Sequence, residues 1–433
     1  MDSSTVGALG LIVMLGLMAL GMPIAFAMAL VGAGGYVWLA GLKAGLSLLG
    51  MVPFSTAFTY TFSVIPLFIL MGQFAFHAGL VTDLYRTANV WLGRLPGGLA
   101  MATIGASAGF AAVSGSSTAA AATIGTVCIP EMRRHDYAPS LSAGSAAAGG
   151  TLAIMIPPSM LFIIYCSLVE ESVGKLFIAG IIPGIVLSLL FILAIYLTVR
   201  MDPWAGPRGA KTTILEKMIS LRKTWEILTL FFVVMGGIYA GLFTPTEAAA
   251  VGAFGSFIFA VGKRRLTFKN LTSSLLDTGR TTAMIFALLI AAGIFSNFLA
   301  ISQLPVKLTG FVTGLAISKY IIFSGICSIY LALGCIMSSI EMIIITLPIF
   351  YPMILSLGFD PIWFGVVTVA MVEVGVLTPP VGINVYVISG TAKDIPLYTI
   401  FRGVTPFVLS IFLLILLLTL FPQLTLFLPR LMR

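Results

Sequence analysis

Long apolar runs without charged residues occupy most of the chain, and short polar segments separate them. A helix needs roughly 20 apolar residues to cross a bilayer. Leu176–Val199 and Gly403–Pro429 have lengths that suit a single crossing. Ala44–Thr82, Leu95–Pro130 and Tyr137–Val169 are too long for one straight helix, so each must bend, break or turn back. The pattern predicts an all-α membrane protein in which some helices are interrupted.

The polar segment at residues 200–224 divides these runs into two halves, residues 1–199 and 225–433. Basic side chains mark the cytoplasmic side of a membrane protein. When the apolar runs are followed outward from this cytoplasmic linker, the first half crosses the membrane five times. Because five is odd, the second half starts on the opposite side and repeats the first half upside down. The predicted domains are a first inverted repeat, a cytoplasmic linker and a second inverted repeat. The basic residues of the linker are Arg200, Arg208, Lys211, Lys217, Arg222 and Lys223.

Each repeat of five transmembrane spans is also expected to contain one re-entrant hairpin. Arg94 and Arg133 are basic residues of the kind that marks the cytoplasmic side, so the apolar residues between them must enter and leave the membrane on that same side. The turn of this first hairpin is expected near Ser114–Thr118, and that of the second near Ser338–Glu341.

One broken helix is expected in each repeat. The first break comprises Gly149–Thr151 and then Ile156–Ser159, and the second comprises Glu373–Asn384. Each Pro-Pro pair removes backbone amides and frees upstream carbonyls. Several residues recur 222 positions later, which indicates one unit written twice, with a site between the copies. The recurring residues are Pro130 and Pro352, Pro139 and Pro361, Pro157 and Pro379, Pro158 and Pro380, and Ser116-Ser117 and Ser338-Ser339.

Composition supports the same class of protein. Hydrophobic residues make up 59% of the chain and charged residues 9%, whereas a soluble domain averages about 25% charged residues. The net charge is +8, but the basic residues form short clusters between apolar runs, as cytoplasmic loops do. The four cysteines lack metal-ligand spacing. We therefore expect a lipid bilayer around the protein, no nucleic-acid partner and no cofactor.

The hairpin tips and broken helices are where we expect chemistry, because irregular backbone at bilayer depth persists only where protein or water covers it. Half-helix N-termini offer free amides and partial positive charge to a carboxylate. Unwound carbonyls and hydroxyls offer oxygen ligands to Na⁺. The tip Ser114–Thr118 has four hydroxyls in five residues. A small-residue helix contact is the alternative, and the matched pairs of tips and breaks favour an ion site.

Three carboxylates lie within apolar segments, and an intramembrane ionisable group is a functional candidate. Glu373 is beside the second break and could tune cation binding or hold the scaffold. Glu341 follows the second tip. Glu247 comes three residues after Thr244 at a helix start, so a capping role is favoured for it.

At these motifs the chain resembles the large membrane subunit of tripartite ATP-independent periplasmic (TRAP) transporters. The resemblance runs from about Ala8 to Phe421, nearly the whole chain. The segments that carry it are Ser114–Thr118, Gly150–Ser159, Gly241–Ala248, Gly358–Pro361 with Phe364-Gly365, and Leu377–Asn384.

The resemblance implies secondary active, Na⁺-coupled uptake of an organic acid, such as a dicarboxylate or sialic acid. A transport domain would move elevator-fashion against a scaffold. The implied partners are a small four-helix membrane subunit and a periplasmic substrate-binding protein that delivers the substrate. The implied location is the bacterial inner membrane, with Na⁺ as the coupling ion and no cofactor.

Carried onto this chain, the resemblance implies two Na⁺ sites with the carboxylate substrate between them. The first Na⁺ site would comprise Ser114, Gly115, Ser116, Ser117, Thr118, Gly150 and Thr151. The second Na⁺ site would comprise Gly334, Ser338, Gly375, Val376, Thr378 and Pro379. The substrate site would comprise Ser116, Ser117, Pro157, Pro158, Ser338, Ser339, Pro380 and Asn384. In the second tip, Ser338 stands where the family pattern has an aspartate, and Glu341 replaces a small residue.

No catalytic pattern supports an enzyme, because the chain has two histidines, no His-Glu-x-x-His and no Walker A loop. An intramembrane protease would need a serine with His or Lys at matched depth, which neither tip offers. A channel would favour parallel repeats around a pore. A dicarboxylate/Na⁺ symporter that works without a binding protein is the remaining alternative. A neighbouring reading frame that encodes a binding protein would favour a TRAP system over this symporter.

Overall fold

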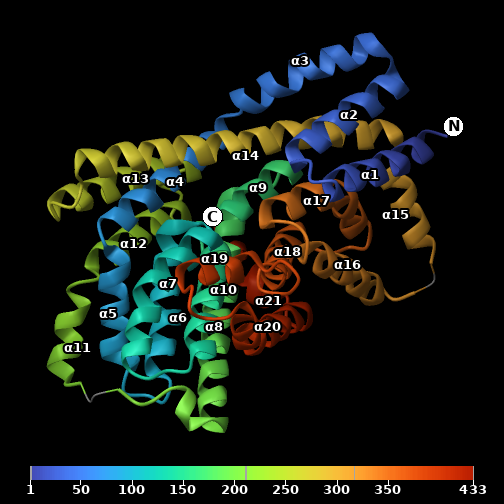
Figure 1. The fold of residues 1–433 in the computed structure, drawn as a ribbon. Helices are drawn as coiled ribbons and strands as arrows, with labels where there is room; N and C mark the ends of the chain where they lie inside the picture. Colours follow the sequence, from blue (N-terminus) through green and yellow to red (C-terminus); the bar gives the residue numbers. More distant parts are fainter. Residues whose placement is uncertain (1, 210–211, 316, 433) are drawn as a thin grey trace.

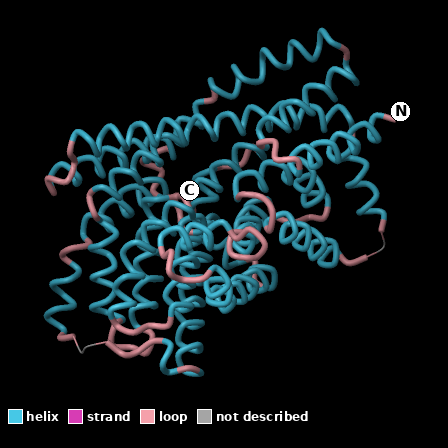
Figure 2. The backbone as a smooth tube through the Cα atoms, viewed as in Figure 1, coloured by secondary structure: helices cyan, strands magenta, loops and turns pink. Residues whose placement is uncertain are grey.

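The computed structural model describes residues 2–209, 212–315 and 317–432, so Lys211 of the predicted linker lies outside the described residues. Every regular element in these ranges is a helix (Figures 1 and 2), which confirms the predicted all-α class. The first-half helices are α1 (Ser3–Ala19), α2 (Ile24–Ala40), α3 (Leu42–Phe58), α4 (Val64–His77), α5 (Leu80–Leu92), α6 (Gly98–Ser114), α7 (Ser117–Arg134), α8 (Pro139–Met155), α9 (Met160–Val169) and α10 (Val173–Met201), with the 3₁₀ turn η1 (Tyr60–Ser63).

The linker contains the 3₁₀ turn η2 (Pro203–Ala205) and the short helix α11 (Ile214–Leu221). The helices of the second half are α12 (Trp225–Tyr239), α13 (Pro245–Gly262), α14 (Phe268–Ser302), α15 (Leu304–Gly314), α16 (Lys319–Gly334), α17 (Ser339–Ser356), α18 (Pro361–Gly375), α19 (Ile383–Thr391), α20 (Leu397–Leu420) and α21 (Gln423–Leu431).

Seven helical segments within the described ranges are long and apolar enough to cross a membrane, and shorter apolar helices accompany them. The chain is therefore a multi-pass membrane protein by length and composition. The seven segments are Tyr60–His77, Pro139–Val169, Val173–Met201, Pro245–Gly262, Phe268–Ser302, Ser339–Ser356 and Leu397–Leu420.

The helices form two bodies that lie side by side in Figure 1. The long helix α14 packs against α2 and α4, and α13 packs against α4; we call these four helices the framework layer. The second body, which we call the inner group, contains α6 to α10 and α16 to α20, with α8 packed against α6, α7 and α20. Large apolar side chains such as Phe162, Phe177 and Trp363 are fully buried there.

Both predicted helix interruptions at hairpin tips are present. Helix α6 ends at Ser114 and α7 begins at Ser117, and the two helices pack against each other. Helix α16 ends at Gly334 and α17 begins at Ser339, and these two also pack together. Gly115 has a φ of +62°, a left-handed conformation that glycine adopts without steric cost.

The proline breaks are also present, but one predicted part of the first break is wrong. Helices α8 and α9 are separated at Pro157-Pro158, and α18 and α19 at Pro379-Pro380. Gly149–Thr151 instead lies within the continuous helix α8. A Cβ on Gly150 would lie 2.6 Å from the Ala121 Cβ, so the small residues serve close packing of α8 on α7 rather than unwinding.

Candidate functional site

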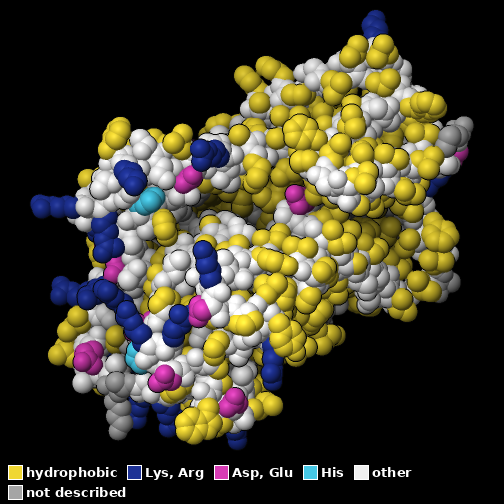
Figure 3. Space-filling view, viewed as in Figure 1, with side chains coloured by type: hydrophobic (Ala, Val, Ile, Leu, Met, Phe, Trp, Pro, Cys, Tyr) yellow, Lys and Arg dark blue, Asp and Glu magenta, His cyan; other side chains and the backbone are white. Residues whose placement is uncertain are grey.

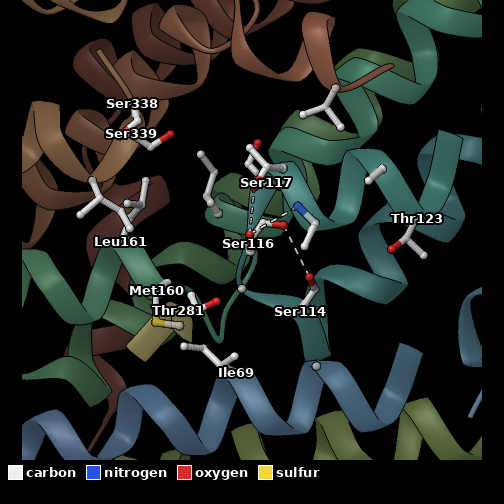
Figure 4. A pocket seen from close by; sticks show the side chains of 18 of the residues that line it. Ile69, Ser114, Ser116, Ser117, Thr123, Met160, Leu161, Thr281, Ser338 and Ser339 are labelled. Atoms are coloured by element: carbon white, nitrogen blue, oxygen red, sulfur yellow. Dashed lines mark hydrogen bonds between the residues drawn. The ribbon is translucent and has the colours of Figure 1, made fainter. Parts of the chain in front are cut away.

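A cavity of about 630 Å³ lies between the inner group and the framework layer, and both hairpin tips reach it. Figure 4 shows Ser114, Ser116 and Ser117 on one side, with Ser338 and Ser339 across from them. Framework helices α4 and α14 line another side of the cavity. The other lining residues include Ile69, Gly72, Gln73, Phe76, Phe110, Gly115, Thr118, Ala119, Ala122, Thr123, Ile154, Met160, Leu161, Thr281, Met284, Ile285, Ile340, Val376, Ile383 and Val387.

Four helices begin at this cavity. Ser117, Met160, Ser339 and Ile383 are the first residues of α7, α9, α17 and α19, and all four line the cavity. The N-terminus of a helix carries unpaired amides and a partial positive charge. Four such ends converging on one partly open cavity favour a negative ligand there, although the Glu341 carboxylate offsets part of the charge at the start of α17.

No Lys, Arg, His, Asp or Glu is among the lining residues. The polar side chains that line the cavity carry hydroxyls, apart from the amide of Gln73. An anion in this cavity would therefore be balanced by helix N-termini and by any cations bound beside it. Neutral donors at helix N-termini suit a carboxylate, because they bind it without a fixed opposite charge.

The first tip is held by its own polar groups and by the first break. The Ser116 hydroxyl caps α7, accepting from the Ala119 amide at 3.4 Å, and lies 3.4 Å from the Thr118 hydroxyl. The Gly115 carbonyl accepts from the Met160 amide at 3.4 Å. A Cβ on Gly115 would lie 3.2 Å from the carbonyl oxygen of Pro158, so the tip and the first break are in close contact.

Gly150 and Thr151 lie deeper in the inner group than the tip. Gly150 packs on α7 at Ala121, one turn beyond Thr118. Thr151 is fully buried, and its hydroxyl donates to the Ala148 carbonyl of the same helix at 2.8 Å. The structure thus brings Ser114–Thr118 together with Pro158, and places Gly150 and Thr151 behind them.

Asn384 joins the second broken helix to the first tip. It is fully buried, and its amide nitrogen donates to the Ser117 hydroxyl at 2.6 Å and to the Ala147 carbonyl at 3.2 Å. The Ser117 hydroxyl also lies 2.9 Å from the Asn384 amide oxygen.

At the other end of α7, Arg133 pairs with Asp394, and this pairing lowers the pKa of the Asp394 carboxyl from its ordinary value.

The predicted substrate residues divide into two groups. Ser116, Ser117, Ser338 and Ser339 line the cavity. The other four are not among its lining residues, because Pro157, Pro158 and Asn384 are buried in the inner group and Pro380 is exposed elsewhere.

The second tip meets the second break at two glycines. A Cβ on Gly375 would lie 2.6 Å from the Gly334 Cα, so the backbones of α16 and α18 touch here. The Thr378 hydroxyl donates to the Gly375 carbonyl at 3.4 Å and lies 3.7 Å from the Cys335 sulfur. The Val381 amide donates to the Cys335 carbonyl at 3.3 Å.

Of the predicted second Na⁺ site, the structure therefore brings Gly334, Gly375 and Thr378 together. Val376 instead lines the cavity, and Pro379 is exposed. Sequence reasoning missed Cys335, although its position directly after Gly334 in the tip was a signal.

Ser338 and Glu341 form a helix cap. The Glu341 carboxylate accepts from the Ser338 amide at 2.8 Å, in a capping box at the start of α17. The predicted cap at Thr244 and Glu247 is confirmed, since the Glu247 carboxylate accepts from the Thr244 amide at 2.8 Å.

Glu373 differs from these two carboxylates. It is fully buried in α18, and neither carboxyl oxygen has a hydrogen-bond partner among the described residues. It lies 222 positions after Thr151, whose hydroxyl is satisfied within α8.

Comparison with known proteins identifies a matching family and relatives of similar sequence. The family model described as "Tripartite ATP-independent periplasmic transporter, DctM component" matches residues 11–424. The C4-dicarboxylate TRAP transporter large permease protein DctM of Pseudomonas aeruginosa is 36% identical over 378 residues, which cover 87% of this chain and 88% of that protein. The sialic acid TRAP transporter large permease protein SiaM of Vibrio cholerae is 30% identical over 423 residues, covering 96% of this chain and 97% of that protein.

Solved structures support the fold. MtrF of Neisseria gonorrhoeae, described as illuminating a class of antimetabolite efflux pumps, aligns with a TM-score of 0.61 at 15% sequence identity. The alignment covers 88% of this chain and 85% of that chain. At this identity the similarity concerns the fold alone.

Proposed function

The chain belongs to the tripartite ATP-independent periplasmic transporters as a DctM component, and on that premise we propose that it takes up an organic acid together with Na⁺. The resemblance predicted from the sequence is confirmed by the family match. The expectation of a transporter rather than an enzyme is also confirmed, since the family and both named relatives are transport permeases.

The observation that carries the proposal is the meeting of four helix N-termini at one cavity without charged side chains. This arrangement favours a carboxylate ligand. The two named relatives carry a C4-dicarboxylate and sialic acid by their descriptions. We propose the same class, organic acids, for this chain.

Two clusters of oxygen atoms support the proposed Na⁺ sites. The first is the tip Ser114–Thr118, whose hydroxyls and carbonyls lie against the first break. The second is the junction of Gly334, Gly375 and Thr378, where carbonyls and a hydroxyl converge. Ions at these two places would lie at the tips that border the cavity, where their charge would add to that of the helix ends.

We propose that the inner group moves against the framework layer during transport. The cavity lies between these two bodies, so a substrate held by the tips would travel with the inner group. The matched order of α6 to α9 and α16 to α19 supports a repeated unit. We propose that the two copies are inverted, with re-entrant hairpins at the two tips.

The proposed partners follow from the family. A periplasmic binding protein would deliver the substrate, and a small four-helix membrane subunit would accompany the chain in the bacterial inner membrane. The alternative is a dicarboxylate/Na⁺ symporter that needs no binding protein, and the cavity geometry alone fits both.

Uptake by reconstituted vesicles tests the proposal. The chain, the small subunit and the binding protein are combined, and uptake of a labelled organic acid is measured with an inward Na⁺ gradient and in Na⁺-free buffer at the same pH. We expect uptake only with Na⁺ and only with the binding protein. Equal uptake without Na⁺ refutes the coupling, and equal uptake without the binding protein supports the alternative symporter.

A further inference from the structure

The linker between the two halves contains a short helix, α11, with an apolar outward face. Ile214 is 81% exposed and Leu215 is 69% exposed, and Met218 and Ile219 are also exposed. At the helical spacing of about 100° per residue, these side chains and Leu221 occupy one broad face. In water such a face would be unfavourable.

The opposite face of α11 is polar and is fixed to the protein. The Thr87 hydroxyl of α5 donates to the Ser220 carbonyl at 2.9 Å. The Lys217 ammonium lies 5.6 Å from the centre of the Trp91 ring, also on α5. The helix is therefore held in place with its apolar side turned outward, the reverse of a helix that packs on a soluble core.

The preceding chain and the helix cap strengthen this orientation. The Gly209 amide donates to the Gly93 carbonyl at 2.8 Å, and the Thr212 hydroxyl donates to the Val90 carbonyl at 2.8 Å. Thr213 and Glu216 form a capping box at the start of α11. The apolar outward face thus belongs to an ordered helix.

The flanking residues exclude the hydrocarbon core as the place of α11. Arg208, Arg222 and Lys223 are exposed on either side of it, and eight residues are too few to span a bilayer. The boundary between headgroups and acyl chains accommodates both an apolar face and charged flanks.

The charge and the aromatic residues identify the kind of lipid surface. Exposed Trp204 and Trp225 lie at either side of α11, and tryptophan is enriched at membrane interfaces. Figure 3 shows Lys and Arg side chains gathered at the end of the molecule that carries α5 and α11. The linker has two acidic residues: Asp202 accepts from the Trp204 amide, and Glu216 is engaged in the helix cap. The more numerous basic residues therefore complement anionic headgroups.

We propose that α11 is an interfacial anchor, with its apolar face between the lipids of the cytoplasmic leaflet and its basic flanks on anionic headgroups. It fixes the junction of the two halves, through α5, at one depth in the membrane.

Depth measurement in vesicles tests the anchor. Met218→Cys in the full chain is labelled with an environment-sensitive fluorophore after reconstitution, and lipids with spin labels at shallow and deep acyl positions quench it. We expect blue-shifted emission, with the shallow label quenching most. His135→Cys, in an exposed loop, is the matched control and should stay unquenched, and the unsubstituted chain measures background from the native cysteines.

Water-like emission at position 218 would overturn the anchor, as would strongest quenching by the deep label. Loss of the quenching when the small membrane subunit is added would also overturn it, because that subunit would then be the occupant of this face.

A second measurement tests the headgroup charge. Spin-labelled phosphatidylglycerol should quench the label at position 218 more than spin-labelled phosphatidylcholine does. Arg222→Gln with Lys223→Gln should reduce this preference by roughly fivefold for each charge removed. Lys43→Gln with Lys393→Gln, on α3 and after α19, removes the same charge elsewhere and should leave the preference unchanged. Equal loss in both double variants would show a general charge effect and would overturn the headgroup contact.

Discussion

Asn384 and Ser117, 267 residues apart in the chain, share a buried hydrogen-bonded contact that ties the second broken helix to the first hairpin tip. Each residue belongs to a different half of the protein. The contact gives the two halves a direct link beside the cavity, and a third partner, the Ala147 carbonyl, fixes it to α8.

Asn384→Ala should lower both stability and uptake. The substitution leaves the Ser117 hydroxyl and the Ala147 carbonyl without this partner, and an unsatisfied buried polar group costs about 1–3 kcal/mol. Ser117→Ala should have a smaller effect, because Asn384 keeps its bond to Ala147. Thermal unfolding of the two single variants and the double variant provides the measurement. Strict additivity of the two effects would show that the residues do not interact.

Gly375→Ala should weaken Na⁺-dependent uptake. The added Cβ would lie 2.6 Å from the Gly334 Cα and would force the backbones of α16 and α18 apart. Overpacking costs about 1–3 kcal/mol, and a cost of that size borne by the proposed ion site corresponds to a loss of about 5- to 150-fold in apparent Na⁺ affinity. Gly390→Ala is the matched control, because a Cβ there meets open space. The Na⁺ concentration that gives half-maximal uptake is measured for both variants, and equal values would contradict a role of this junction in Na⁺ binding.

Glu373→Met should raise the stability of the folded protein. Both carboxyl oxygens of Glu373 are buried without partners, and replacing such a group by an apolar side chain of similar size removes a cost of about 1–3 kcal/mol. Thermal unfolding in detergent measures the effect, with Glu247→Met as the comparison. The latter should lower stability, because Glu247 caps α13. A lower unfolding temperature for Glu373→Met would mean that the carboxyl has a binding partner in the working protein.

Residues 131–136 should face the cytoplasm. A cysteine in place of His135 should resist a membrane-impermeant thiol reagent in intact cells and react after the membrane is opened. A cysteine in place of Glu171, in the loop between α9 and α10, should react in intact cells. The opposite pattern would invert the proposed topology, and reaction of both sites from outside would exclude it.

Local sequence signals predicted much of the fold. Pro157-Pro158 and Pro379-Pro380 marked the breaks because proline cannot continue the hydrogen bonding of a helix. Ser114–Thr118 marked a tip because its residues favour turns and caps. The cap at Thr244 and Glu247 was predictable because both partners lie within one helical turn.

Contacts between distant segments were not predictable in the same way. Gly149–Thr151 has the composition of a break, yet α7 packs against it and the helix continues. The substrate role predicted for Asn384 stays a prediction, and no sequence signal indicated its buried contacts with Ser117 and the Ala147 carbonyl. The outward apolar face of α11 was not predicted from the polar linker sequence. The direction in which this face points depends on contacts between α11 and α5, which sequence spacing does not reveal.

The four helix ends would attract an anion through main-chain amides, which every amino acid except proline supplies. Substitutions along the cavity wall can therefore change its size and shape while its preference for negative ligands persists. Related transporters could therefore change from one organic acid to another by altering the cavity volume alone, because the backbone amides that attract the acid stay in place.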